Sequence, residues 1–256
     1  MDEPALTMTR DGGTARITLT RPGRRNSLSE TVLVELLTAL DTVAASDATG
    51  LVLAAEGPVF SAGHDFADVG ARDVQGVRAL LDLCTSVMLR MHSLPQVVIA
   101  RVHALATAAG CQLVASADLA VAADTAGFAL PGGAGGWFCH TPAVPVARAV
   151  GRKRLMEMAL TGDVVDAATA LQWGLVNRVV PADELDTAVH ELLARATRGS
   201  AAGKAWGKQV LYAQLDRPEV DGYAIAVPAM AAASQTSAAR EGRAAFLEKR
   251  RPVFTD

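Results

Sequence analysis

The sequence lacks the features that mark several classes of protein. Aromatic residues make up only 4% of its 256 residues, and its three cysteines (Cys84, Cys111 and Cys139) are widely spaced. This pattern excludes a disulfide framework and a Cys-x-x-Cys zinc site, and it is typical of thiols in a reducing compartment. Lysine and arginine number 24 against 27 acidic residues, a formal net charge of −3, and no basic stripe is present. A nucleic-acid partner is therefore not expected.

Long apolar runs are also missing. The most apolar region, residues 97–123, is interrupted by Arg101, His103, Gln112 and Asp118, and a membrane helix needs about 18 consecutive apolar residues. The chain opens with Met-Asp-Glu-Pro, which is acidic and has no apolar stretch, so neither a secretory signal nor a basic transit peptide is predicted. Together these absences predict a soluble, cytoplasmic protein with no membrane partner.

The common cofactor and catalytic motifs are absent as well. Gly203-Lys204 lacks the upstream glycine and the following Ser or Thr of a phosphate-binding loop, and the glycine tract 132–136 lacks the spacing of a dinucleotide-binding loop. No two of the five histidines are four residues apart, and no serine lies in a Gly-x-Ser-x-Gly elbow. We therefore expect no metal site and no tightly bound cofactor. A Ser-His-Asp triad stays open, because its members meet only in space.

Half of the residues are apolar, enough to bury the core of one sizeable domain. Strand and helix patterns alternate along the chain, and this alternation predicts an α/β fold of stacked β-β-α turns up to about residue 195, followed by a helical C-terminal region, 196–256. Ser27 and Glu30 have the spacing of a capping box and predict a helix start with Ser27 as its N-cap. The expected strands are 15–20, 51–55, 97–102, 119–123 and 175–180, and the expected helices include 32–43, 77–91 and 109–117.

Two loops rich in glycine and alanine follow predicted strands, residues 60–66 and 104–112. Small side chains let a backbone approach a ligand closely, and the second loop leads into a helix, whose first N–H groups are free and carry a partial positive charge. Two such loops facing each other would hold a developing oxyanion. Tight packing of strand on helix is the alternative interpretation of the same pattern.

Motifs along nearly the whole chain resemble those of the crotonase superfamily, which contains the enoyl-CoA hydratases and isomerases. The matching segments are 21–28 (opening motif), 60–66 (first oxyanion loop), 104–123 (second oxyanion loop, helix and strand), 149–162 and 168–181 (later signature), and 246–251 (C-terminal motif). Within the family, Gly63-His64-Asp65 and residues 106–112 are most similar to the subgroup of enoyl-CoA hydratase domain-containing proteins, which lacks both catalytic glutamates.

The resemblance implies a fold, an assembly and a ligand. The implied fold is a crotonase-like spiral of β-β-α units with a C-terminal helical trimerisation region, assembled as a homotrimer or a dimer of trimers. The implied ligand is an acyl-CoA thioester, with coenzyme A as part of the substrate, and the implied setting is fatty-acid metabolism. The backbone N–H groups of His64 and Ala109 match the pair that binds the thioester oxygen. The positions matching substrate-binding residues are Arg24, Arg25, Ser27, Ala62, Asp65, Phe66, Gly110, Pro131, Phe246 and Lys249.

The sequence departs from the family at its two catalytic glutamates. The matching positions hold Gln112 and Gly132. The glutamine side chain is an amide, which does not act as a general base near neutral pH, and glycine has no side chain to do so. His140 and the His64 side chain are candidate replacements, because a histidine pKa suits proton transfer; a structural role is the alternative for each. Cys111 is predicted at a helix start, where a thiolate is favoured, or else serves as a small buried apolar side chain.

Three functions therefore stay open at this point. The first is a hydratase-like lyase or isomerase of the enoyl-CoA hydratase family that uses the two amides on an acyl-CoA. The second is a pseudo-enzyme that binds acyl-CoA without turnover, as the loss of both glutamates suggests. The third is another reaction that needs an oxyanion site, such as thioester hydrolysis or decarboxylation.

Overall fold

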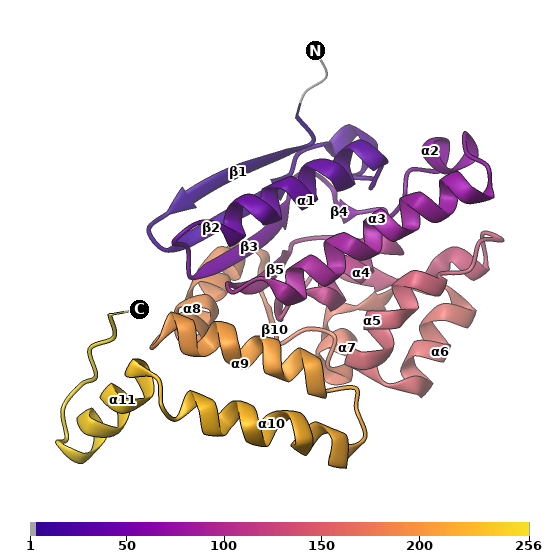
Figure 1. Ribbon diagram of the computed structural model, residues 1–256. Coiled ribbons are helices and arrows are strands. Elements are labelled where there is room, and N and C mark those ends of the chain that lie inside the picture. Colours follow the sequence, from indigo (N-terminus) through magenta and orange to yellow (C-terminus); the bar gives the residue numbers. More distant parts are fainter. Residues whose placement is uncertain (1–3, 256) are drawn as a thin grey trace.

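Two β-sheets form the centre of the molecule, which a computed structural model describes over residues 4–255 (Figure 1). The expectation about a leader falls partly on residues 1–3, outside the described residues. The larger sheet has the strand order β1 (Leu6–Asp11), β2 (Thr14–Leu19), β3 (Gly50–Ala55), β5 (Val97–Val102), β7 (Leu119–Ala123), β10 (Arg178–Val180). The smaller sheet has the order β4 (Val59–Ser61), β6 (Leu105–Thr107), β8 (Gly127–Ala129), β9 (Val165–Asp166). Neighbouring strands are parallel except in the pairs β1–β2 and β8–β9.

Successive units of the chain place one strand in each sheet before a helix follows, which confirms the β-β-α spiral expected from the sequence. The strands β3 and β4 precede α2 (Phe66–Gly70) and α3 (Val74–Ser93), and β5 and β6 precede α4 (Ala109–Ser116). The strands β7 and β8 precede α5 (His140–Val150) and α6 (Arg152–Thr161). Three short 3-10 helices complete the connections: η1 (Pro22–Arg24), η2 (Pro131–Gly133) and η3 (Ala182–Glu184).

The larger sheet is covered on both faces, so its central strands are apolar at every position. In β3, Leu51 and Leu53 point into the main core with α1 (Glu30–Ala44) and α3. The alternate residues Val52 and Ala54 point the other way, toward α8 (Leu185–Thr197). Parallel strands with both faces covered read as continuous apolar runs, and this explains why 51–55 could be predicted as a strand without any alternation.

The start of α1 differs from the capping-box prediction. Ser29, not Ser27, is the N-cap, and its hydroxyl accepts a hydrogen bond from the Val32 amide at 3.4 Å. Leu28 forms a parallel bridge with His64, so the chain is still extended at that point and the helix begins later. The Ser27 hydroxyl instead donates to Asp65 Oδ2 at 3.0 Å, which ties the opening motif to the first loop.

The C-terminal part of the chain is helical, as expected. It contains α7 (Ala167–Trp173), α8, α9 (Ala201–Gln214), α10 (Glu219–Ala233) and α11 (Ser237–Leu247). Among these, α9 packs on α3, and both α10 and α11 pack on α9 (Figure 1). The domain boundary near residue 195 stays a prediction. Within residues 4–255, none of the helices combines the length and the apolar character needed to cross a bilayer.

Candidate acyl-binding site

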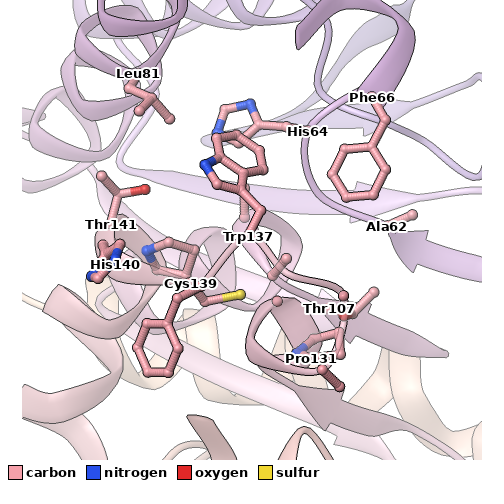
Figure 2. A pocket seen from close by; sticks show the side chains of 17 residues that line it. Ala62, His64, Phe66, Leu81, Thr107, Pro131, Trp137, Cys139, His140 and Thr141 are labelled. Atoms are coloured by element: carbon pink, nitrogen blue, oxygen red, sulfur yellow. The ribbon is translucent and has the colours of Figure 1, made fainter. Parts of the chain in front are cut away.

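A cavity of about 460 Å³ lies between the two glycine- and alanine-rich loops and the start of α5 (Figure 2). Its size is typical of a small-molecule site. Both predicted loops contribute to the wall, and α3 and the segment that follows η2 supply the rest. The lining residues are Ala62, His64, Phe66, Leu81, Thr107, Ala108, Ala109, Pro131, Gly132, Ala134, Gly135, Trp137, Phe138, Cys139, His140, Thr141 and Pro142.

The first loop passes close to the start of α4 at one edge of this cavity. Gly63 has a φ of +84°, and a Cβ atom on it would lie 3.0 Å from the backbone nitrogen of Ala109. Ala109 is the first residue of α4, where N–H groups have no partner within the helix. Within residues 4–255, no group accepts a hydrogen bond from the N–H of His64 or of Ala109. The two loops therefore lie close together at this point, and each carries a backbone N–H that has no acceptor among the described residues.

Small residues make this arrangement possible. A Cβ atom on Gly110 would lie 2.3 Å from the carbonyl oxygen of Ser61, so only glycine allows the first turn of α4 to rest on β4. Ala108 has a φ of +51°, a conformation that costs a non-glycine residue free energy and is concentrated at functional sites. Its amide donates to the Ala129 carbonyl at 2.9 Å, which holds the strained residue in place. Tight strand–helix packing is thus present at this loop, together with a strained residue of the kind found at functional sites.

The structure places the two residues that replace the glutamates very differently. Gln112 is 3% exposed and does not line the cavity, and its Oε1 has no hydrogen-bond partner among the described residues. Gly132 lines the cavity, but a Cβ atom on it would lie 2.1 Å from the Trp137 carbonyl oxygen and 2.8 Å from Cys139 Sγ. The segment around Trp137 therefore occupies the space where a side chain at position 132 would begin.

Few groups that line the cavity can carry charge. Among the described residues that line it there is no Asp, Glu, Lys or Arg. Burial lowers the pKa of His64, against smaller opposing effects of the Leu28 carbonyl and the Asp68 carboxylate. Burial raises the pKa of the Cys139 thiol. Cys111 is fully buried, and burial raises its pKa to about 12, so the structure supports the apolar rather than the thiolate interpretation of that residue.

The residues of the opening motif lie beside the first loop, outside the cavity lining. Asp65 accepts hydrogen bonds from the Ser27 hydroxyl and from the Ala67 amide, and so caps α2. Arg24 is largely exposed, with its Nη1 3.8 Å from Asp65 Oδ2. Arg25 is exposed too, and its carbonyl accepts from the Ala62 amide at 3.0 Å.

The two C-terminal positions lie far from this region in the same chain. Phe246, which is 82% exposed, is in α11, and Lys249 follows that helix with a φ of +55°. In Figure 1, α11 lies on the opposite side of the molecule from α2 and α5.

Sequence reasoning missed part of the wall. Leu81 on α3, Thr107 and Trp137 line the cavity, although the sequence had not identified them as site residues. Nothing in the sequence identifies Leu81, because its helix approaches the loops only through the packing of α3 on the core.

The chain is similar to known proteins over nearly its full length. A family model described as enoyl-CoA hydratase/isomerase matches residues 9–256. The solved structure of an enoyl-CoA hydratase from Mycobacterium smegmatis is 44% identical with a TM-score of 0.96, covering 99% of this chain and 100% of that one. Human enoyl coenzyme A hydratase domain-containing protein 3 is 38% identical with a TM-score of 0.93, covering 98% and 100%. The rat protein named enoyl-CoA hydratase domain-containing protein 3, mitochondrial, is 40% identical, covering 99% of this chain and 85% of the rat protein.

These comparisons confirm the expected family and subgroup and overturn the expected location. The relatives from Rattus norvegicus, Mus musculus, Danio rerio and Homo sapiens all carry the word mitochondrial in their names, which points away from the cytoplasm. The cytoplasmic prediction was wrong because it rested on the lack of long apolar runs, on the absence of a recognisable signal or transit pattern and on unpaired thiols, and none of these identifies a compartment.

Proposed function

The chain belongs to the enoyl-CoA hydratase/isomerase family, and from that premise we propose that it binds an acyl-CoA thioester in the cavity. Members of this family act on acyl-CoA thioesters. In the proposed complex the thioester oxygen lies between the amides of His64 and Ala109. The observation that carries the proposal is the pair of free N–H groups brought together at Gly63. Such donors favour the negative oxygen of an enolate over a neutral carbonyl, and one well-placed donor contributes about 3–4 kcal/mol.

The residues around the two amides indicate how the ligand is oriented, with its acyl group inside the cavity and its coenzyme A part toward the opening motif. Leu81, Phe138 and Pro142 form an apolar wall suited to a hydrocarbon acyl group. Arg24 and Arg25 lie exposed beside the first loop, where guanidinium groups are available to the phosphates of coenzyme A. Hydration by two carboxylates is not part of the proposal, because no carboxylate among the described residues lines the cavity.

Binding of octanoyl-CoA, measured by isothermal titration calorimetry, tests this function. Replacing Gly63 with alanine would place a methyl group 3.0 Å from the Ala109 nitrogen and block the space in front of its N–H. Losing one neutral hydrogen bond to the ground-state thioester, together with the added methyl group, is expected to weaken binding about tenfold. The matched control is Gly151→Ala: Gly151 also has a positive φ, +78°, but no atom lies within 4 Å of the added methyl, and its affinity should stay within about threefold. No binding of octanoyl-CoA to the unmodified protein, or equal binding by Gly63→Ala, would contradict the proposal.

We also propose that the chain assembles through its C-terminal helices, as a homotrimer or a dimer of trimers. No residue of α10 is buried, although Val220, Tyr223, Val227 and Met230 recur at helical spacing and are each 62–80% exposed. A continuous apolar stripe of this kind marks an interaction surface. An assembly would also give a role to Phe246 and Lys249, which are far from the cavity of their own chain and would close that of a neighbouring copy.

Charge placed on the stripe is expected to dissociate the assembly. The double variant Tyr223→Glu, Val227→Glu should elute as a monomer in size-exclusion chromatography with light scattering, because ionised side chains are not tolerated in a dry apolar interface. Val34→Glu, at a 49% exposed position on α1, is the control and should leave the mass unchanged. A monomeric unmodified protein would show that α10 does not mediate self-assembly.

A further inference from the structure

The His64 side chain has no hydrogen-bond partner, although it lies in the wall of the cavity (Figure 2). Both of its ring nitrogens, Nδ1 and Nε2, are buried and unpaired among the described residues. Leaving a buried polar atom unpaired costs about 1–3 kcal/mol, so an imidazole with two such atoms is an expensive feature to keep for packing alone. Unpaired buried polar atoms in native proteins are often associated with function.

Packing and a polar contact with the Leu28 carbonyl hold this ring in place, since neither ring nitrogen makes a hydrogen bond of normal geometry among the described residues. The Trp137 ring lies 6.1 Å away, tilted by 50°, and Phe66 lies 6.1 Å from Trp137 on the outer side. A half-turn about the Cβ–Cγ bond exchanges each ring nitrogen with a ring carbon. Only the contact with the Leu28 carbonyl is given up when a nitrogen turns toward the cavity, and the ring keeps its shape when it turns.

The other groups on the cavity wall are poorer proton carriers. Burial keeps Cys139 as a neutral thiol by raising its pKa. His140 is exposed at the first turn of α5, with its ring 5.0 Å from that of Phe138, so its ring is open to bulk water and is not enclosed with a bound ligand. His64 is held neutral by burial, which lowers its pKa, and a neutral imidazole has a free nitrogen ready to accept a proton.

We propose that the His64 imidazole is the proton carrier of this site, and that the reaction it supports is the shift of a double bond in an enoyl thioester; the proposal rests on the acyl-CoA function above. A ring nitrogen takes a proton from Cα of a β,γ-unsaturated acyl group. The electron pair of the broken C–H bond forms a dienolate, whose oxygen lies between the amides of His64 and Ala109. The imidazolium then returns the proton to Cγ, which leaves the double bond between Cα and Cβ. Nothing is oxidised or reduced, and the ring ends neutral.

One proton carrier is enough for this reaction but not for hydration. The shift removes and returns a single proton, so one base that becomes an acid completes it. Adding water across a double bond also needs a group that activates the water, and the two positions that would supply carboxylates hold a buried amide at Gln112 and a glycine with no space beside it. The chemistry left to the cavity is therefore proton transfer at carbon.

The experiment separates the side chain of His64 from its amide, because His64→Ala and His64→Gln keep the backbone N–H. Two rates are followed in the full-length protein: deuterium incorporation at Cα of octanoyl-CoA in deuterium oxide, by NMR, and conversion of a β,γ-unsaturated octenoyl-CoA into its conjugated isomer, by ultraviolet absorbance. Both variants should lower both rates by about 10²–10⁴-fold, the usual contribution of a general base, while the octanoyl-CoA Kd changes by less than about threefold. Glutamine keeps the hydrogen-bonding capacity of the ring but cannot take up and release a proton near neutral pH, so it would rescue a merely positioning role and not a proton-transfer role.

The controls distinguish this proposal from the function on which it rests. His190→Ala, on the exposed face of α8, should leave both rates unchanged. If octanoyl-CoA binds but His64→Ala exchanges deuterium as fast as the unmodified protein, the assignment of His64 is wrong and the binding function stands. Loss of exchange in His140→Ala but not in His64→Ala would transfer the role to His140. If no acyl-CoA binds at all, both proposals fall.

Discussion

A glutamate introduced at position 132 is expected to break the cavity wall and to yield no hydratase. The first atom of any side chain there would lie 2.1 Å from the Trp137 carbonyl oxygen and 2.8 Å from Cys139 Sγ. A backbone oxygen cannot turn aside as the end of a flexible side chain can, so the segment after η2 has to move as a whole. Overpacking alone costs about 1–3 kcal/mol, and we expect Gly132→Glu to lower the free energy of unfolding by about 3 kcal/mol or more.

A matched pair of alanine variants isolates the steric cause. Gly132→Ala meets the same two atoms, whereas the methyl group of Gly135→Ala in the same loop would lie no closer than 3.7 Å to any neighbour. In urea denaturation, Gly132→Ala should be destabilised by about 2–3 kcal/mol, and Gly135→Ala should stay within about 0.5 kcal/mol of the unmodified protein. Equal stability of the two variants would show that the segment yields easily and that the clash is not the reason for glycine at this position.

Restoring the other glutamate is expected to fail for a different reason. Gln112 is 3% exposed, and a carboxylate at so buried a position has a raised pKa and tends to stay protonated. Crotonyl-CoA hydration, followed as the loss of ultraviolet absorbance, should therefore stay at the buffer rate in the double variant Gln112→Glu, Gly132→Glu. Measurable hydration by a stably folded double variant would mean that the missing carboxylates alone separate this chain from a hydratase.

Most of the longer elements of the core could be predicted because each carries its own pattern, although the six-residue strand β1 was not predicted. The strand β7 has the predicted limits, and α4 and β3 begin or end within one residue of their predicted limits. The strands β4, β6 and β8 were not predicted, because each has only three residues and an alternating pattern needs more. The cap of α1 was misplaced by two residues because the bridge between Leu28 and His64 is a long-range contact. Contacts of that kind leave no local signal.

In the candidate site, too, local features could be predicted from the sequence and features that depend on long-range contacts could not. The two loops were predicted from their composition, and the pairing of the His64 and Ala109 amides on one oxygen, which the family resemblance implies, stays a prediction. The state of the His64 ring was not predictable, because it depends on which groups surround the ring after folding. The closed space beside Gly132 was equally invisible in the sequence, since it arises where the chain turns back at Trp137 to begin α5.

Removing the Lys208 ammonium is expected to detach the C-terminal helices from the core. Lys208, on α9, has a side chain 10% exposed, and its Nζ lies 2.7 Å from Asp118 Oδ2. It also donates to the carbonyls of Met91 and Gln96 at 2.8 and 2.9 Å. Asp118 in turn accepts from Val98 N at 2.7 Å. Asp118 lies before β7, so this cluster joins α9 to the sheet and to the end of α3.

Lys208→Met keeps the aliphatic length of the side chain but leaves the Asp118 carboxylate buried without its cation. Breaking a buried ion pair from one side costs about 3–5 kcal/mol, because the remaining charge is uncompensated. Urea denaturation should show a loss of that size in the free energy of unfolding. The control is Arg78→Met, which breaks an exposed pair with Asp82 whose side chains are 77% and 73% exposed; pairs of that kind contribute about 0–1 kcal/mol. If the free energy of unfolding falls equally little in both variants, water reaches Asp118 and α9 is held to the core by apolar contacts alone.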